Sequence, residues 1–262
     1  MTDSLPDPSL FALARRWAAD SLRSRGLAAS ASYLAGQLWF LLRDNTPERR
    51  RSRFGDMEYD FDHAVDTTWA RLPLRVRLRE VFTERLYQPT VPEEFEAVMA
   101  ELAAVDFTGY TFIDLGSGKG RALLLATRLP FAAIVGVEVQ PELHRTALAN
   151  LAAFDKSEAL CRNLSAHCCD ARDYDFPSSP LLVYLFNPFP GYVLERVLAN
   201  LEGSLRKNPR PVFLAYNAPY EQNVVDAYLR RHGNFLRCII ARRKFVIYSN
   251  VEGGDDEPQE ES

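Results

Sequence analysis

The spacing of apolar residues divides the chain into a helical first part and a second part in which strands and helices alternate. In residues 9–43 apolar positions recur every three or four residues, as on one face of a helix, and Gly26 interrupts the pattern. We therefore expect two helices that break near Gly26. Residues 54–90 show only short helical stretches. Residues 92–104 predict a clear helix, because Pro92 and acidic residues begin it and its apolar residues share one face.

From Tyr110 onward, short apolar runs alternate with amphipathic stretches. The runs typical of strands are 110–115, 133–139, 164–169, 181–186 and 211–216, and the stretches typical of helices are 120–129, 141–153, 190–202 and 219–231. This alternation predicts an α/β fold with a doubly wound, mostly parallel sheet. Two final runs, 235–241 and 244–250, predict a hairpin at one sheet edge. The last of the seven expected strands should therefore be antiparallel.

The same pattern predicts four parts. They are a helical N-terminal extension (1–53), a cap or lid that includes the helix before the sheet (54–109), the sheet domain (110–250) and a disordered acidic tail (251–262). We expect the first two parts to cover the site of the sheet domain.

Composition and charge exclude several classes of protein. With 47% hydrophobic and 25% charged residues, the chain has the composition of an ordinary globular protein, neither disordered nor polytopic in a membrane. The formal net charge is −4, and the last twelve residues hold six acids and no base, so the rest of the chain carries +2. A nearly neutral body gives no electrostatic reason to expect nucleic-acid binding.

One uncharged segment, residues 26–42, invites comparison with a membrane span. Its 17 residues lie at the lower limit for crossing a bilayer, and it contains Ser30, Ser32, Gly36 and Gln37. We expect a helix packed against protein, with a membrane-spanning or interfacial helix as the alternative. The first ten residues lack the basic start and apolar core of a signal peptide, which predicts a cytoplasmic protein.

Two charged segments precede the sheet. Arg49, Arg50, Arg51 and Arg53 predict a solvated linker, with contact to phosphate or an acidic partner as the alternative. In the segment after them the acids alternate with apolar residues, namely Asp56, Glu58, Asp60 and Asp62 with Met57, Tyr59 and Phe61. We expect a solvated acidic loop. The alternative is an extended segment whose acids lie on one side, as an anionic lid for an amine. His63 beside them is a candidate general base.

The cysteines and the strand histidine suggest no metal chemistry. Cys161, Cys168, Cys169 and Cys238 form no CxxC pair, and no histidine has zinc-finger spacing to them. We expect reduced thiols in the core of a cytosolic protein, with a vicinal redox pair or thiolate metal site as the alternative. His167 lies inside an expected strand and should be buried.

The most informative segment is TFIDLGSGKGRALLLA, residues 111–126. An apolar strand ends in Asp114, then Gly116, Gly118 and Gly120 alternate with other residues, and a helix follows. Glycines allow a tight turn and close approach of a ligand above a helix N-terminus. The spacing fits neither the Walker loop nor the GxGxxG dinucleotide loop, because Gly120 follows Lys119 and position 121 is Arg. An acid before the turn favours a ligand with a cationic end and no phosphate.

S-adenosylmethionine meets that description, and DLGSGKG resembles the first motif of the class I methyltransferases, D/E-x-G-x-G-x-G. The resemblance implies a Rossmann-like methyltransferase domain in which Asp114 and the loop, including Ser117, bind this cofactor. Glu138 ends the next strand, 18 residues after Gly120, where an acid can hold both ribose hydroxyls. The family implies that role for Glu138 and packing of Val139 on the adenine. A plain acid at a strand end is the alternative for Glu138.

Further parts of the chain resemble family elements. Asp170 matches the acid that faces the adenine amino group, with Ala171 beside it, although a helix cap is an alternative for Asp170. Tyr87-Gln88-Pro89-Thr90 resembles the Y-x-P-[ST] loop of non-SET lysine methyltransferases, which closes over the methionine end of the cofactor. Tyr87 and Thr90 are thus candidate cofactor contacts, with a helix cap by Thr90 as the alternative.

Asn187, Pro188 and Phe189 follow the fourth expected strand, where the family carries its substrate-side motif. They resemble the motif of amino-methyltransferases, in which a side-chain oxygen and a backbone carbonyl hold an amino group, although a simple turn is an alternative. Nucleobase enzymes have Asn-Pro-Pro-aromatic, whereas the order here is Asn-Pro-Phe-Pro, so a DNA base is disfavoured. No acidic ligand set accompanies Asn187, so we expect no metal.

These features predict an S-adenosylmethionine-dependent methyltransferase that acts on a small-molecule amine or a protein lysine. Three alternatives stay open from the sequence: an O-methyltransferase of a small molecule, a dinucleotide-binding oxidoreductase, and a non-catalytic module that binds the cofactor. A membrane association and the binding of nucleic acid are not expected.

Overall fold

A computed structural model describes residues 9–43, 57–68, 72, 74–83 and 87–251. The chain forms two compact units, Met1–Pro89 and Thr90–Ser262, which are described separately below. The arginine cluster at 49–53 and the acidic residues from 252 onward lie outside the described residues. The four parts expected from the sequence, and their role as a cap, stay predictions.

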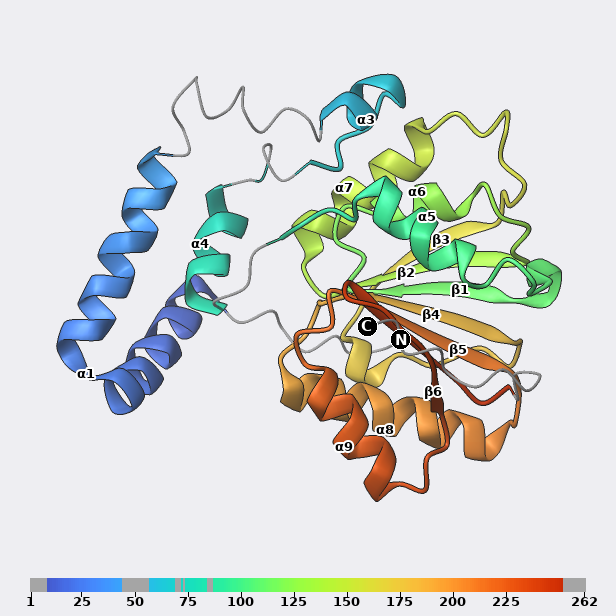
Figure 1. Cartoon of the computed structure of the whole chain (residues 1–262). Coiled ribbons are helices and arrows are strands. Elements are labelled where there is room, and N and C mark those ends of the chain that lie inside the picture. Colours follow the sequence, from blue (N-terminus) through green and yellow to red (C-terminus); the bar gives the residue numbers. More distant parts are fainter. Residues whose placement is uncertain (1–8, 44–56, 69–71, 73, 84–86, 252–262) are drawn as a thin grey trace. The chain divides into compact units, whose positions relative to one another are not determined.

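The first unit contains a long helix that Gly26 breaks in two. Helix α1 (Leu10–Arg43) has non-helical dihedrals at Gly26, with φ 79° and ψ 172°, which confirms the expected break (Figure 1). The hydroxyls of Ser21 and Ser30 lie 2.8 Å apart across the break, and the rings of Trp17 and Tyr33 stack at 5.6 Å. Within the described residues, every helix is either too short or too polar to span a bilayer.

Two shorter helices complete this unit, α3 (Met57–Asp62) and α4 (Leu74–Thr83). The extended form that was the alternative for residues 56–62 is wrong for the described part, which is helical. Asp60 stabilises a turn after this helix. Its buried carboxylate accepts hydrogen bonds from the backbone N–H groups of Thr67 and Thr68, both at 2.8 Å. In this helix Glu58 and Asp62 share one face and Asp60 lies on the other, so these three acids do not all point to one side as they would in an extended chain. His63 lies beside the ring of Tyr59, with centroids 4.4 Å apart.

The second unit is built on a seven-stranded sheet in the order β3-β2-β1-β4-β5-β7-β6. The strands are β1 (Thr111–Leu115), β2 (Ala133–Glu138), β3 (Leu164–Cys168), β4 (Leu181–Phe186), β5 (Val212–Asn217), β6 (Arg237–Ala241) and β7 (Phe245–Ser249). The first five run parallel, and β7 is antiparallel to both β5 and β6. This confirms the predicted fold class, including the reversed last strand.

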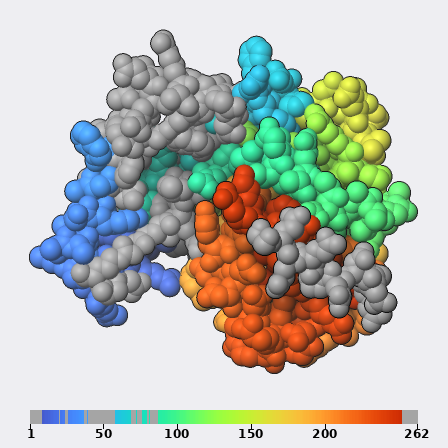
Figure 2. Space-filling view, viewed as in Figure 1, coloured from blue at the N-terminus to red at the C-terminus, as the bar shows by residue number. Residues whose placement is uncertain are grey.

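Helices cover both faces of the sheet (Figure 1). On one side lie α5 (Pro92–Ala100), α6 (Arg121–Ala126) and α7 (Pro141–Ala153), and on the other α8 (Gly191–Lys207) and α9 (Gln222–Arg231). Two 3-10 turns, Phe107–Gly109 and Ala171–Asp173, precede β1 and follow β3. Figure 2 shows the orange side chains of the C-terminal helices as one continuous surface. Because helices cover both faces of the sheet, alternate residues along β1 enter different cores. Phe112 and Asp114 lie on the α5 side, and Ile113 and Leu115 lie on the α8 side.

The edge strands correct two expectations about burial. His167 in β3 is exposed, and so are Cys168 in β3 and Cys238 in β6, while Cys169 is half-buried. Of the four free cysteines only Cys161 is buried, so the prediction of core thiols holds for that residue alone. The reason is position, since β3 and β6 are the outermost strands and each has a neighbour on one side only.

Candidate functional site

The site that the sequence predicts lies where the strand order reverses. Strands β1 and β4 are neighbours, while β2 and β3 continue to one side and β5 to the other. In open α/β sheets, ligands bind outside the carboxyl ends of the strands at such a switch point. The glycine loop follows β1, Glu138 ends β2, and Asn187 follows β4, so all three belong to this edge.

The three glycines of the loop use their conformational freedom. Gly116, Gly118 and Gly120 have φ values of 83°, 54° and 88°, in the left-handed region that side chains disfavour. A Cβ added at Gly116 would lie 2.4 Å from Cβ of Pro188. The absence of a side chain thus lets the loop after β1 touch the loop after β4. The structure brings the predicted cofactor motif and the predicted substrate-side motif together at this contact.

Glu138 holds the loop in shape. One carboxylate oxygen accepts a hydrogen bond from the N–H of Gly118 at 2.9 Å, and the other accepts one from the N–H of Gln140 at 2.8 Å. Its side chain is buried, whereas the adjacent Val139 is 54% exposed. An acidic group at the rim with an uncovered apolar side chain beside it suits a nucleoside, whose sugar is polar and whose base is flat.

Asp114 is a buried acid beside a second one. Its side chain is only 5% exposed. Burial, and then the charge of Glu138, raises the pKa of Asp114 to about 8. A cation that enters this edge would relieve both effects, since it would pair with the carboxylate and offset its repulsion from Glu138.

Asn187 adopts a left-handed conformation, with φ 40°, directly after β4. Its N–H donates to the carbonyl of Asn217 at 3.2 Å, and its Oδ1 accepts from the hydroxyl of Tyr216 at 3.3 Å. Asn is among the residues that tolerate this region. Phe189 is half-buried and packs against the core on the α8 side. Its expected place over a substrate stays a prediction.

Asp170 caps the 3-10 turn Ala171–Asp173, which is one of the two roles that the sequence suggested for it. Its carboxylate accepts from the N–H of Arg172 at 2.9 Å and from the Arg172 guanidinium, with Nη2 at 2.6 Å. These side-chain hydrogen bonds hold the pKa of Asp170 below its ordinary value. Ala171 is buried. The contact of this pair with an adenine stays a prediction.

Tyr87 and Thr90 fall in different units. The Tyr87 hydroxyl donates to the carbonyl of Thr67 at 2.7 Å, within the first unit. Thr90 is buried in the second unit, where its side chain hydrogen-bonds the hydroxyl of Tyr184. The alternative of a cap by Thr90 is wrong, because the residue before α5 is Val91 and no side chain caps that helix. The role of both residues toward the cofactor stays a prediction.

The sequence analysis missed a polar network under this edge. The fully buried Asn217 donates from Nδ2 to the Tyr184 hydroxyl at 3.1 Å and lies 3.4 Å from Glu94, which pairs with Lys244 at 2.9 Å. Burial raises the pKa of Tyr184, which stays a neutral phenol. The nearest signal for this network in the sequence is Asn217, the polar residue that ends β5. Strand order was needed to see that these residues meet.

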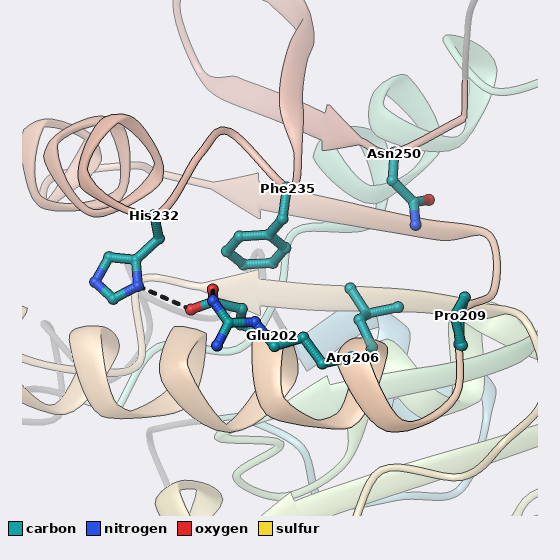
Figure 3. A pocket seen from close by; sticks show the side chains of 7 residues that line it. Glu202, Arg206, Pro209, His232, Phe235 and Asn250 are labelled. Atoms are coloured by element: carbon teal, nitrogen blue, oxygen red, sulfur yellow. Dashed lines mark hydrogen bonds and ion pairs between the residues drawn. The ribbon is translucent and has the colours of Figure 1, made fainter.

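A cavity of about 250 Å³ lies elsewhere, between the C-terminal half of α8 and the segment after α9 (Figure 3). Glu202 accepts there from His232 Nδ1 at 3.0 Å and from the Tyr228 hydroxyl at 2.7 Å. None of the predicted site residues lines it.

Within the described ranges, no group of three His, Cys, Asp or Glu side chains is placed to hold a metal ion.

Comparison with protein families and with curated proteins finds no match. Among solved structures, the chain is similar to human methyltransferase 10 domain containing protein, at 17% identity and a TM-score of 0.48, over 78% of this chain and 96% of that one. It is also similar to magnesium protoporphyrin IX methyltransferase from Synechocystis PCC 6803 with bound SAM, at 13% identity and 0.46, over 84% and 97%.

A third similar structure is the ribosomal protein L11 methylase from Lactobacillus delbrueckii subsp. bulgaricus, at 11% identity and a TM-score of 0.45, over 63% of this chain and 90% of that one. All three are methyltransferases or methylases by name. The fold of this chain rests on its own strand order and registers.

Proposed function

We propose that the protein is an S-adenosylmethionine-dependent methyltransferase that methylates the nitrogen of an amine, in a small molecule or a protein lysine. One observation carries the proposal. The glycine loop lies between two buried acids, Asp114 and Glu138, and touches Pro188 of the Asn-Pro-Phe segment. A cation site and a hydrogen-bonding group for an acceptor thus share one edge of the sheet.

The charge of this edge favours an adenosyl sulfonium over a dinucleotide. A diphosphate would bring two negative charges toward Asp114 and Glu138, and these charges would disfavour the carboxylate form of Asp114 further. S-adenosylmethionine brings a sulfonium and an amino group. The oxidoreductase alternative is therefore disfavoured by the same feature that supports the methyltransferase.

When bound, S-adenosylmethionine supplies an activated methyl group, so the protein has mainly to align the acceptor. Transfer of the methyl is an in-line displacement, and aligning the two reacting groups lowers the barrier to it. Asp114 would balance the positive charge of the cofactor, and Glu138 would keep the loop closed while it holds the ribose. Asn187 Oδ1 has a second lone pair that an amino group could use.

An amine is the favoured acceptor because the carboxyl end of β4 carries an amide where metal-assisted O-methyltransferases need carboxylates. An amide oxygen accepts a hydrogen bond from N–H and orients the nitrogen lone pair without fixing a metal. O-methylation of a small molecule remains the competing activity. Cytoplasmic location and the absence of nucleic-acid substrates belong to the same proposal.

Calorimetry with S-adenosylhomocysteine tests the cofactor. The wild-type protein should bind it and should not bind NAD. Glu138→Ala should weaken the affinity by about 1–3 kcal/mol, because charged hydrogen bonds to the ribose and the loop are lost. A protein that binds NAD and ignores S-adenosylhomocysteine would refute the proposal. Tritiated cofactor, incubated with cell lysate and sorted into protein, nucleic-acid and small-molecule fractions, then identifies the acceptor class.

A further inference from the structure

The end of β5 holds the loop after β4 at two points. The carbonyl of Asn217 accepts the N–H of Asn187 at 3.2 Å, and the Tyr216 hydroxyl donates to Asn187 Oδ1 at 3.3 Å. The first contact fixes the backbone of Asn187 in its left-handed conformation. The second contact reaches the side-chain atom that, under the proposed function, faces the acceptor.

The surroundings of Tyr216 decide which way its hydroxyl proton points. The N–H of Glu221, at the start of α9, donates to the Tyr216 oxygen at 3.3 Å. A backbone N–H can only donate, so the phenol oxygen accepts from Glu221, while its hydroxyl donates to Asn187 Oδ1. If the Asn187 amide were flipped, its NH₂ group would face the phenol in place of Oδ1, and the hydrogen bond from the Tyr216 hydroxyl to Oδ1 would be lost.

The ring of Tyr216 is in turn held by packing. Its side chain is 1% exposed and belongs to the core formed by the sheet with α8 and α9. Close-packed interiors leave a ring little freedom, so the hydroxyl has a defined position relative to the sheet. The two hydrogen bonds of the Tyr216 hydroxyl, both 3.3 Å, are longer than the ~2.8 Å typical of O–H donors and the ~3.0 Å typical of N–H donors, so packing supplies much of the precision.

We propose that Tyr216 is a positioning residue that fixes the orientation of the Asn187 amide, with Oδ1 as the acceptor for a substrate amino group. The inference rests on the proposed function and adds to it a residue that does not touch the substrate. Tyr216 connects Asn187 to the start of α9 through hydrogen bonds. The orientation of the amide that binds the acceptor therefore depends on the core of the molecule rather than on the loop after β4.

Sinefungin makes the inference testable without knowledge of the acceptor, because this adenosyl analogue has an ammonium group in place of the transferred methyl. The measured quantity is the ratio of sinefungin affinity to S-adenosylhomocysteine affinity. Asn187→Ala should lower this ratio about 10-fold or more, as expected for one lost hydrogen bond to a charged group. Tyr216→Phe should lower it in the same direction, about 3-fold or more, with unchanged affinity for S-adenosylhomocysteine.

Tyr228→Phe is the matched control, because it removes another hydroxyl buried in the same core, which donates to Glu202 at 2.7 Å. It should leave the ratio unchanged even if it lowers the melting temperature. Asn187→Asp gives a second measurement, since a carboxylate has two equivalent oxygens and cannot be flipped. In the Asn187→Asp background, Tyr216→Phe should no longer change the ratio.

The outcomes separate the inference from the function beneath it. A wild-type protein that fails to bind S-adenosylhomocysteine refutes the proposed function. If this ligand binds and the ratio falls in Asn187→Ala but not in Tyr216→Phe, Tyr216 is only structural and the inference is overturned. A ratio that Asn187→Ala leaves unchanged also overturns it, because Asn187 then does not face the methyl position.

Discussion

Burying a carboxylate costs free energy, and Asp114 is nevertheless buried near the end of β1. Its pKa of about 8 means that the side chain is mostly protonated at pH 7 in the free protein. A cationic ligand favours the carboxylate. The residue therefore couples the binding of a cation to the release of a proton.

We expect the binding of S-adenosylmethionine to release protons at pH 7, and its affinity to rise with pH up to about 8 and then level off. The sign follows from the raised pKa, because below it part of the binding energy is spent on removing a proton. Calorimetry in two buffers of different ionisation enthalpy measures the release. Asp114→Asn has no proton to lose there, so equal proton release in wild type and variant would contradict the assignment.

The contact between Gly116 and Pro188 gives a second prediction at this scale. Gly116→Ala should cost about 1–3 kcal/mol of stability and remove S-adenosylhomocysteine binding, because the new Cβ meets Pro188 and φ is 83°. Gly203→Ala is the control, since nothing lies within 4 Å of its added Cβ in α8. It should be stabilising by roughly 0.5–1 kcal/mol. Similar losses in both variants would show that the contact is unimportant.

At the scale of elements, Glu202 joins α8 to α9. Its buried carboxylate accepts from the Tyr228 hydroxyl and from His232, both near the end of α9. Glu202→Ala should lower the free energy of unfolding by about 1–3 kcal/mol, because the Tyr228 hydroxyl loses its buried acceptor. Urea unfolding measures the loss. Affinity for S-adenosylhomocysteine should not change, and a marked fall would link the cavity beside Glu202 to the cofactor edge.

The same scale shows what the sequence could predict. Central strands of a parallel sheet are buried on both faces and appear as continuous apolar runs, so β1, β2 and β4 are visible without a structure. The exposure of His167 was not predictable, because it depends on β3 being an edge strand. Strand order and register depend on contacts between distant segments, which local periodicity does not encode.

The candidate site also contains features that the sequence could predict and features that it could not. The glycine loop and Glu138 were predictable, because their chemistry is local in sequence. The hydrogen bonds that Tyr216 and Asn217 make to Asn187 were not predictable, because they depend on the pairing of β4 with β5. The short helix α3 was missed for another reason. Its six residues are too few for a period to be read, and the hydrogen bonds from Thr67 and Thr68 to Asp60 decide the local structure.

For the molecule as a whole, the division at Pro89 separates the glycine loop from the first unit. Residues 90–262 contain the complete sheet with helices on both of its faces. They bury their own core, including Phe112, Tyr184 and Leu198, so they should be able to fold without the residues before them. Asp114, Glu138 and Asn187 all belong to this part.

We therefore expect a protein cut to residues 90–262 to unfold cooperatively and to bind S-adenosylhomocysteine. Its affinity relative to the full chain measures what the first unit adds, including the cofactor contact expected for Tyr87. Full-length Tyr87→Phe is the control, because it removes one hydroxyl and leaves the unit in place. If Tyr87 contacts the cofactor, this variant should reproduce part of the loss in the shortened protein. A shortened protein that folds and binds as tightly as the full chain would remove Tyr87 from the cofactor site.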